Sequence, residues 1–142
     1  MNLNPRNSKL SAYQSVSAHG GIADADPHGL VLMLLDAALE RMNSARGCIE
    51  RGERVRKAKL LHSCVNIILE LRGSLNLEKG GSLAQNLSDL YDYMVRRLLA
   101  ANLENDARPV TEVLGLLGEI RGAWAAIGPE VKQLAPRAAS AA

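Results

Sequence analysis

Residues 26–52 read DPHGLVLMLLDAALERMNSARGCIERG and carry the strongest helix signal in the chain. The Asp-Pro pair opens a helix well, because Asp accepts from free first-turn N–H groups and Pro needs no acceptor there. Apolar residues then recur every three or four positions, and Gly52 suits a C-cap. We therefore predict a helix over residues 27–51, which is either central or presents apolar surface to a partner. The residues that widen its apolar surface are Leu30, Leu32 and Met33.

Three further amphipathic helices follow this segment. The next is predicted over residues 54–78, where two apolar stripes run side by side before Lys-Gly-Gly. Another is predicted over residues 82–104, because Ser82 followed by Gln85 is a capping-box arrangement. The last is predicted between residues 109 and 127, after an Asn-Asp pair that can cap it.

Helices of this length with short connections pack as antiparallel neighbours, so the predicted fold is all-α, an up-down four-helix bundle. The bundle domain is predicted over residues 26–128. Residues 1–25 lack periodicity and are predicted to form a flexible N-terminal arm, and residues 129–142 a short disordered C-terminal tail. Trp124 is expected in the core, where its replacement by Ala costs ~3–5 kcal/mol.

Composition narrows the class of protein. The chain has 142 residues, 47% of them hydrophobic and only 3% aromatic, with a formal net charge of +2. So small a charge and so few aromatic rings argue against a nucleic-acid partner. The chain shows no secretory signal and no apolar run long enough for membrane insertion, so it is predicted to be cytoplasmic. Buried thiols are favoured over a disulfide for Cys48 and Cys64.

Catalytic motifs are missing from the sequence. Its three histidines, His19, His28 and His62, fall in different segments, and no motif typical of hydrolases, nucleotide-binding loops or metal sites occurs. We therefore predict a protein that is not an enzyme and that uses no metal or cofactor. A bundle enzyme using His62 and nearby carboxylates is the weakest of the alternatives.

The run Leu90–Arg97 places two tyrosines among charged residues. On a helix, Tyr93 lies three or four residues from Arg96 and Arg97, hence on one face. Two interpretations stay open. Either the tyrosine rings cover the edge of the core beside a solvated charged face, or the ring and guanidinium together recognise a peptide.

Several segments resemble one known family. They are AYQSV (12–16), ADPHGLVLMLLDAA (25–38), LEKGG (77–81), NLSDLYDYMVRRL (86–98), the pairs Ala101-Asn102 and Asn105-Asp106, and Ala123-Trp124. In order and spacing, over about residues 11–127, they resemble the flagellar secretion chaperone FliS family.

This resemblance implies a cytoplasmic helical chaperone without ATP or metal. The family binds the disordered C-terminal segment of new flagellin, prevents its premature polymerisation and delivers it to the export gate of the flagellar type III secretion system. The implied partners are flagellin and an export gate component, with a co-chaperone or flagellin regulator left open. In the family an N-terminal arm with a tyrosine covers part of the client surface, and Tyr13 matches that tyrosine.

The candidate flagellin-binding residues combine this resemblance with the apolar excess of the first two helices. They are Tyr13, Leu30, Leu34, Ile67, Leu71, Tyr93 and Arg96. Binding would lay a client helix into an apolar groove and fold the client as it binds. The alternative is a non-catalytic helical adaptor or regulator that self-associates through its apolar surface.

Overall fold

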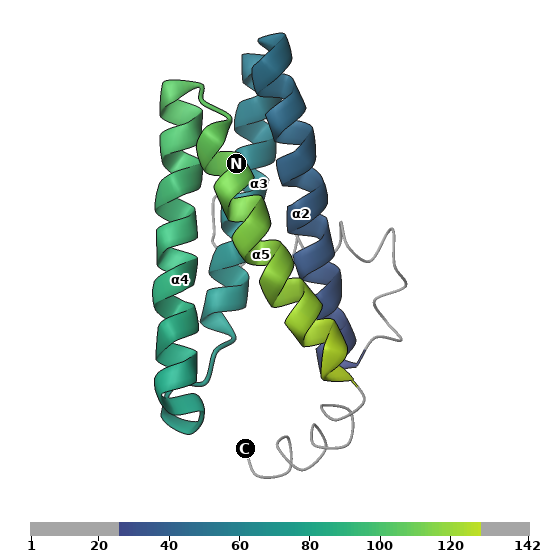
Figure 1. Ribbon diagram of the computed structural model, residues 1–142, viewed down its shortest axis with the longest axis vertical. Helices are drawn as coiled ribbons and strands as arrows, with labels where there is room; N and C mark the ends of the chain where they lie inside the picture. The colour runs from purple at the N-terminus through teal and green to yellow at the C-terminus, as the bar shows by residue number, and fades with distance from the viewer. Residues whose placement is uncertain (1–25, 129–142) are drawn as a thin grey trace, which may run out of the picture.

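A computed structural model describes residues 26–128 of the chain as four helices, α2 (Pro27–Arg51), α3 (Arg54–Gly73), α4 (Leu77–Glu104) and α5 (Arg108–Ala126). Each helix packs against the next in sequence, and α5 returns to pack against α2 (Figure 1). Within this described part there is no β-strand. The predicted all-α four-helix bundle is confirmed. The predicted arm, residues 1–25, and tail, residues 129–142, lie outside the described residues.

The first helix begins and ends where the sequence indicates. Asp26 Oδ1 accepts a hydrogen bond from the N–H of Gly29 at 2.6 Å, and Pro27 occupies the first turn. Gly52 adopts φ +73°, a left-handed conformation that favours glycine, and its N–H bonds to the last carbonyls. The prediction of a helix over residues 27–51 is confirmed.

The boundary between α3 and α4 differs from the prediction. α3 ends at Gly73 rather than residue 78, and the hydroxyl of the C-cap residue Ser74 donates to the carbonyl of Leu71 at 2.8 Å. Asn76 then caps α4, its side chain accepting from the N–H of Lys79 at 3.0 Å. The expected capping box is wrong, since the Gln85 side chain donates instead to Asp89 at 2.9 Å.

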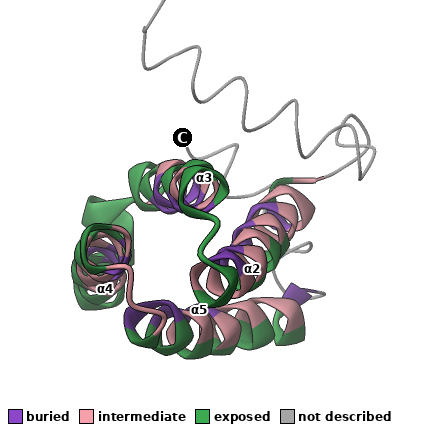
Figure 2. Cartoon of the chain, turned by 90° about the horizontal axis from the view of Figure 1, so that it is seen from above, coloured by how far each residue is buried: buried purple, intermediate pink, exposed green. Residues whose placement is uncertain are grey.

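The core runs along the axis enclosed by the helices, with their buried faces turned inward (Figure 2). Cys48 and Cys64 are both free and buried, which confirms thiols rather than a disulfide. Cys64 Sγ lies 3.6 Å from the carbonyl of Ala38, and burial raises the pKa of its thiol to about 12. Fully buried side chains of the core include Leu35, Met42, Ile68, Met94, Leu98 and Leu117.

A buried lysine joins α3 to the end of α4. Lys57 is 4% exposed, and its Nζ donates to the carbonyl of Asn102 at 2.9 Å and to Oδ1 of Asn105 at 3.0 Å. Asn105, with φ +53°, ends α4 in the left-handed conformation. A cation at a helix C-terminus is favourably placed against the helix dipole. Lys57 therefore fixes this end of the bundle.

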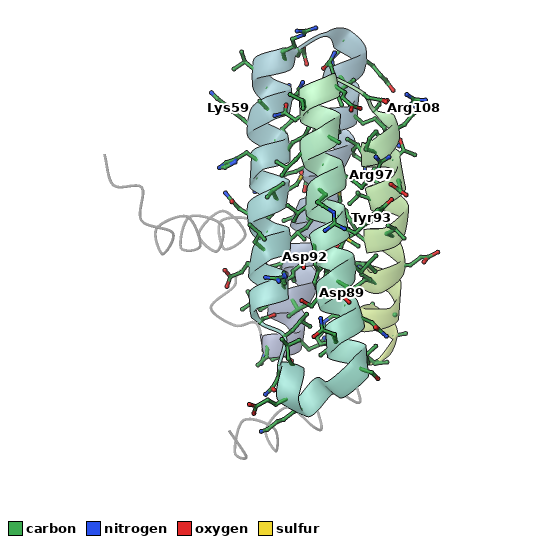
Figure 3. All side chains as sticks on the ribbon, turned by 90° about the vertical axis from the view of Figure 1, so that its left-hand side faces the viewer. Lys59, Asp89, Asp92, Tyr93, Arg97 and Arg108 are labelled. Carbon is green, nitrogen blue, oxygen red and sulfur yellow. The ribbon has the colours of Figure 1, made fainter. Side chains whose placement is uncertain are left out.

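Two further features complete the fold. The N-cap of α5 is Ala107, which makes no side-chain cap bond, so the predicted Asn-Asp cap is wrong in position, although Asp106 accepts from the N–H of Arg108 at 3.0 Å. Arg72 of α3 forms an ion pair with Asp92 of α4 at 2.8 Å, on the face that Figure 3 presents.

Among the residues described, no helix is both long and apolar enough to cross a membrane.

Candidate binding groove

An apolar groove opens at the end of the bundle where α2 and α4 begin and α3 and α5 end. Its volume is about 590 Å³. In Figure 1 this is the lower end, where α5 crosses toward α2 and away from α4. Its lining includes Val31, Leu71, Leu83, Leu87, Ile120 and Trp124.

One wall of the groove is held by a reciprocal pair of side chains. Trp124 Nε1 donates to the carbonyl of His28 at 3.0 Å, and His28 Nε2 donates to the carbonyl of Trp124 at 2.7 Å. The two rings stack with centroids 5.0 Å apart. Trp124 packs against the core but is only partly buried, so the expectation of a core tryptophan is met in part. The pair ties the start of α2 to the end of α5.

The opposite wall is built by the glycine turn at the start of α4. Gly81 has φ +56° and ψ −135°, a conformation that side chains disfavour, and it kinks the helix there. A Cβ on Gly80 would lie 2.5 Å from Cβ of Ala84, so position 80 is too close to Ala84 for a side chain. Leu83, which follows this kink, is 68% exposed at the groove, although its spacing from Leu87 and Leu90 is that of a core stripe.

The groove is nearly free of charge. Of the described residues that line it, Lys79 is the one lysine, arginine or carboxylate. The polar groups near Lys79 already have partners, since Ser74 bonds to Leu71 and Asn76 caps α4. Such a groove favours an apolar ligand surface with a polar edge.

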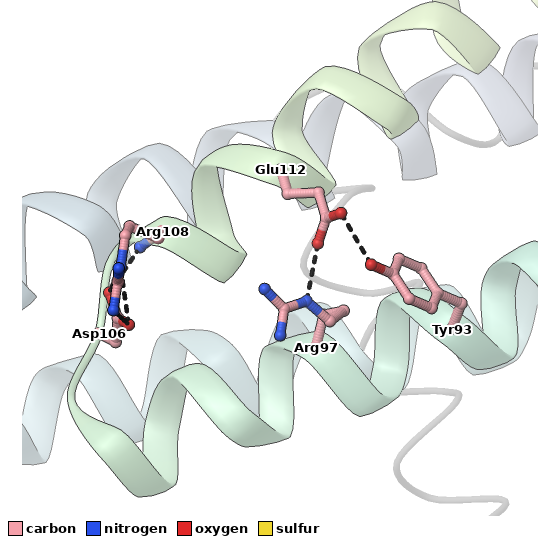
Figure 4. Close-up of polar contacts among 5 residues, drawn as sticks. All are labelled: Tyr93, Arg97, Asp106, Arg108 and Glu112. Carbon is pink, nitrogen blue, oxygen red and sulfur yellow. Dashed lines mark hydrogen bonds and ion pairs between the residues drawn. The ribbon is translucent and has the colours of Figure 1, made fainter.

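A second candidate surface lies on the seam between α4 and α5, shown in Figure 4. Tyr93 donates its hydroxyl to Glu112 at 2.7 Å, and Arg97 Nε donates to the other carboxylate oxygen at 2.7 Å. These bonds lower the pKa of Glu112, and the bond to Glu112 raises the pKa of the Tyr93 hydroxyl. Arg96 Cζ lies 5.9 Å from the centroid of the Tyr93 ring, in cation–π range.

The residues predicted to bind flagellin do not gather at one place. Leu71 is buried but lines the groove, whereas Leu34 and Ile67 belong to the core. Leu30 is half-buried on α2. Tyr93 and Arg96 lie on the α4–α5 seam, and Tyr13 lies outside the described residues.

The sequence interpretation missed the groove residues Leu83, Leu87, Ile120 and Trp124 as a binding surface. They sit on apolar stripes, and periodicity alone does not show where a neighbouring helix stops covering a stripe. The usable signal was local, because two consecutive glycines stand just before Ser82 and Leu83. For metals, no cluster of three or more His, Cys, Asp or Glu suited to a metal ion occurs among residues 26–128.

An open, nearly uncharged groove at the end of a helical bundle is a geometry that an amphipathic helix can occupy. Comparison with known proteins identifies the family: the family model described as flagellar protein FliS matches residues 9–131. The chain therefore belongs to the FliS family.

Named relatives agree with this assignment. The flagellar secretion chaperone FliS of Salmonella typhimurium is 47% identical over 124 residues, covering 87% of this chain and 92% of the relative. FliSB of Pseudomonas aeruginosa, also named a flagellar secretion chaperone, is 42% identical and covers 81% and 91%. FliS of Bacillus subtilis is 37% identical and covers 80% and 81%. All three names describe chaperones rather than enzymes.

Proposed function

We propose that this chain is a cytoplasmic export chaperone for flagellin. It binds the disordered C-terminal segment of flagellin, prevents premature polymerisation and delivers the client to the export gate of the flagellar type III apparatus. The observation that carries the proposal is the apolar groove of about 590 Å³, in a chain whose relatives are named flagellar secretion chaperones.

The groove suits recognition of an amphipathic client helix. An incoming helix would place its apolar face against Leu83, Leu87 and Trp124 while its polar face stays in water. Ordering a disordered client costs ~2–5 kcal/mol, so the client must bury a large apolar area. Because Leu83 is already exposed, this contact needs no opening of the core.

The residues predicted from the sequence extend this surface beyond the groove. Leu30 on α2, and Tyr93 with Arg96 on α4, are accessible to a client that wraps around the bundle. Leu34 and Ile67 are buried, so they can contact a client only if the core opens. Tyr13→Ala is expected to change flagellin affinity at unchanged bundle stability, and equal affinities would reject that role.

The direct test is calorimetric titration of the full chain with the C-terminal segment of flagellin from the same genome. An unrelated amphipathic peptide of equal length serves as the control. We expect saturable one-to-one binding with a large negative heat-capacity change, because apolar surface is buried as the client folds. A folded chain that does not bind the flagellin segment would contradict the proposal.

Two leucines of α4 provide a matched pair of variants. Leu83 is 68% exposed and lines the groove, whereas Leu103 is 87% exposed at the other end of the helix. Leu83→Ser is expected to weaken flagellin binding about 10-fold or more, because burying a leucine contributes about 1.5–3 kcal/mol. Leu103→Ser should leave the affinity unchanged. Equal losses in both variants would remove the groove from the binding site.

The adaptor alternative is favoured by a different surface. Leu99 and Leu103 lie one turn apart on α4, with exposures of 55% and 87%. A second copy could cover such a pair. A molecular mass that rises with concentration, and falls back to the monomer in Leu103→Ser, would support self-association. A constant monomer mass would argue against it.

A further inference from the structure

The C-terminal end of α5 lies at the wall of the groove. The last turns of α5 contribute Ile120 and Trp124 to the lining. Gly128 is buried, and a Cβ in place of its hydrogen would lie 2.8 Å from Cε1 of His28. Because His28 also lines the groove, the residues that follow Gly128 start at the rim of the groove.

The following segment carries groups that match the groove. Residues 129–142, which lie outside the described part, read PEVKQLAPRAASAA. Val131 and Leu134 are its two large apolar residues, and their spacing puts both on one face of a helical turn. Its one acidic side chain, Glu130, precedes Val131 and is opposite in charge to Lys79 of the lining, and the segment also carries Lys132 and Arg137.

The segment is also long enough to reach the lining. Counted from Gly128, an extended chain spans about 10 Å by Val131, and a helical turn from Val131 to Leu134 brings the reach to about 15 Å. A short tether gives a segment an effective concentration in the millimolar range. A contact made by only two apolar side chains can therefore occupy the groove for much of the time.

We propose that residues 129–142 dock in the apolar groove through Val131 and Leu134 and compete there with the client. Only the competition rests on the proposed function, since docking itself needs no client. The match to the family model ends at residue 131, so most of this segment lies beyond it. The proposed docking therefore depends mainly on residues outside the part that the family model matches.

Trp124 provides a test without any client, because it is the single tryptophan of the chain and lines the groove. In the full chain, Val131→Ser combined with Leu134→Ser should move its fluorescence emission to longer wavelength, as water replaces the docked segment. The matched control changes Lys132 and Gln133 to Ser, in the same segment but without apolar loss. It should keep the wild-type emission. An unchanged emission in the Val131, Leu134 variant overturns the proposal.

The same measurement separates the other occupants. A docked segment of the same chain gives wild-type emission that is independent of protein concentration. Emission that shifts on dilution points to a second copy and overturns the proposal. A shift produced by Tyr13→Ala, and not by the Val131, Leu134 variant, assigns the groove to residues 1–25 and overturns it as well.

Competition is tested by titrating both chains with the flagellin peptide. If the segment fills the groove about 80% of the time, its loss tightens apparent client affinity about fivefold. Equal affinities overturn the proposal. An emission shift in a chain that binds no flagellin peptide supports docking while rejecting the proposed function, so the two failures are distinguishable.

Discussion

The two ends of the bundle differ in how their side chains are satisfied. Where α3 begins and α4 ends, Lys57 is buried and bonded to Asn102 of α4 and to its C-cap Asn105, and Asp106 bonds to Arg108. At the groove end, α4 is kinked at Gly81 and Leu83 is left exposed. Polar bonds close one end, while the other keeps apolar surface available. Under the proposed function, the bundle holds its fold at one end and binds its client at the other.

The largest expected effect comes from two leucines of the same helix. Leu98→Ala, at a fully buried position toward the closed end, is expected to lower the free energy of unfolding by about 2–5 kcal/mol. Leu83→Ala, at the groove, should change it by about 0.5 kcal/mol or less. Denaturant unfolding measures both. Similar losses would show that the two ends are equally packed.

Lys57→Met tests the contribution of the Lys57 hydrogen bonds to the stability of the closed end. The substitution leaves the carbonyl of Asn102 and Oδ1 of Asn105 without their donor, which is expected to cost about 1–3 kcal/mol. Lys59→Met is the control, because Lys59 is exposed on the same helix (Figure 3). Its expected effect is within about 0.5 kcal/mol. If the two variants unfold at the same denaturant concentration, the Lys57 hydrogen bonds contribute nothing to the free energy of unfolding.

Two glycines sharpen the comparison at the groove end. Gly81→Ala meets no atom within 4 Å, so its expected loss of about 1–2 kcal/mol comes from the positive φ alone. Gly115→Ala, also in open space but inside α5, should stabilise the chain by up to about 1 kcal/mol. Thermal unfolding compares the two. A stabilising Gly81→Ala would mean that the kink is not needed.

The smallest expected effect concerns the α4–α5 seam. The pKa of Glu112 is lowered mainly by the bond from Tyr93, so its stabilisation is present above the ordinary glutamate pKa and lost as the pH falls through the lowered value. In an NMR titration, Tyr93→Phe should raise the pKa of Glu112 only part of the way, because Arg97 still donates to it. An unchanged pKa would show that the Tyr93 bond does not lower the pKa of Glu112.

Local signals in the sequence predicted some boundaries and missed others. Both ends of α2 were predictable, because Asp26 and Gly52 act through contacts within one turn. The start of α4 was not, since Asn76 and Ser82 are both good caps and their sequences do not rank them. In the structure the Asn76 side chain makes the cap, with Gly81 absorbing the kink that follows.

The site was predictable as a family property but not residue by residue. Leu83 has the spacing of a core residue, and its exposure depends on where α5 diverges from α4, which no local pattern reports. Lys57 could have been noticed, because it stands four residues before Leu61 on a buried stripe. A lysine at such a position predicts an acceptor across the interface.

The buried thiol of Cys64 has a practical consequence for labelling. With a pKa of about 12, only about one molecule in 10⁵ carries the reactive thiolate of Cys64 at neutral pH. Cys48 is shielded by burial as well. A cysteine introduced at the exposed position of Leu83 would then react with maleimide dyes far faster than either native thiol. The wild-type chain thus already serves as the background for site-specific spectroscopic labels at the groove.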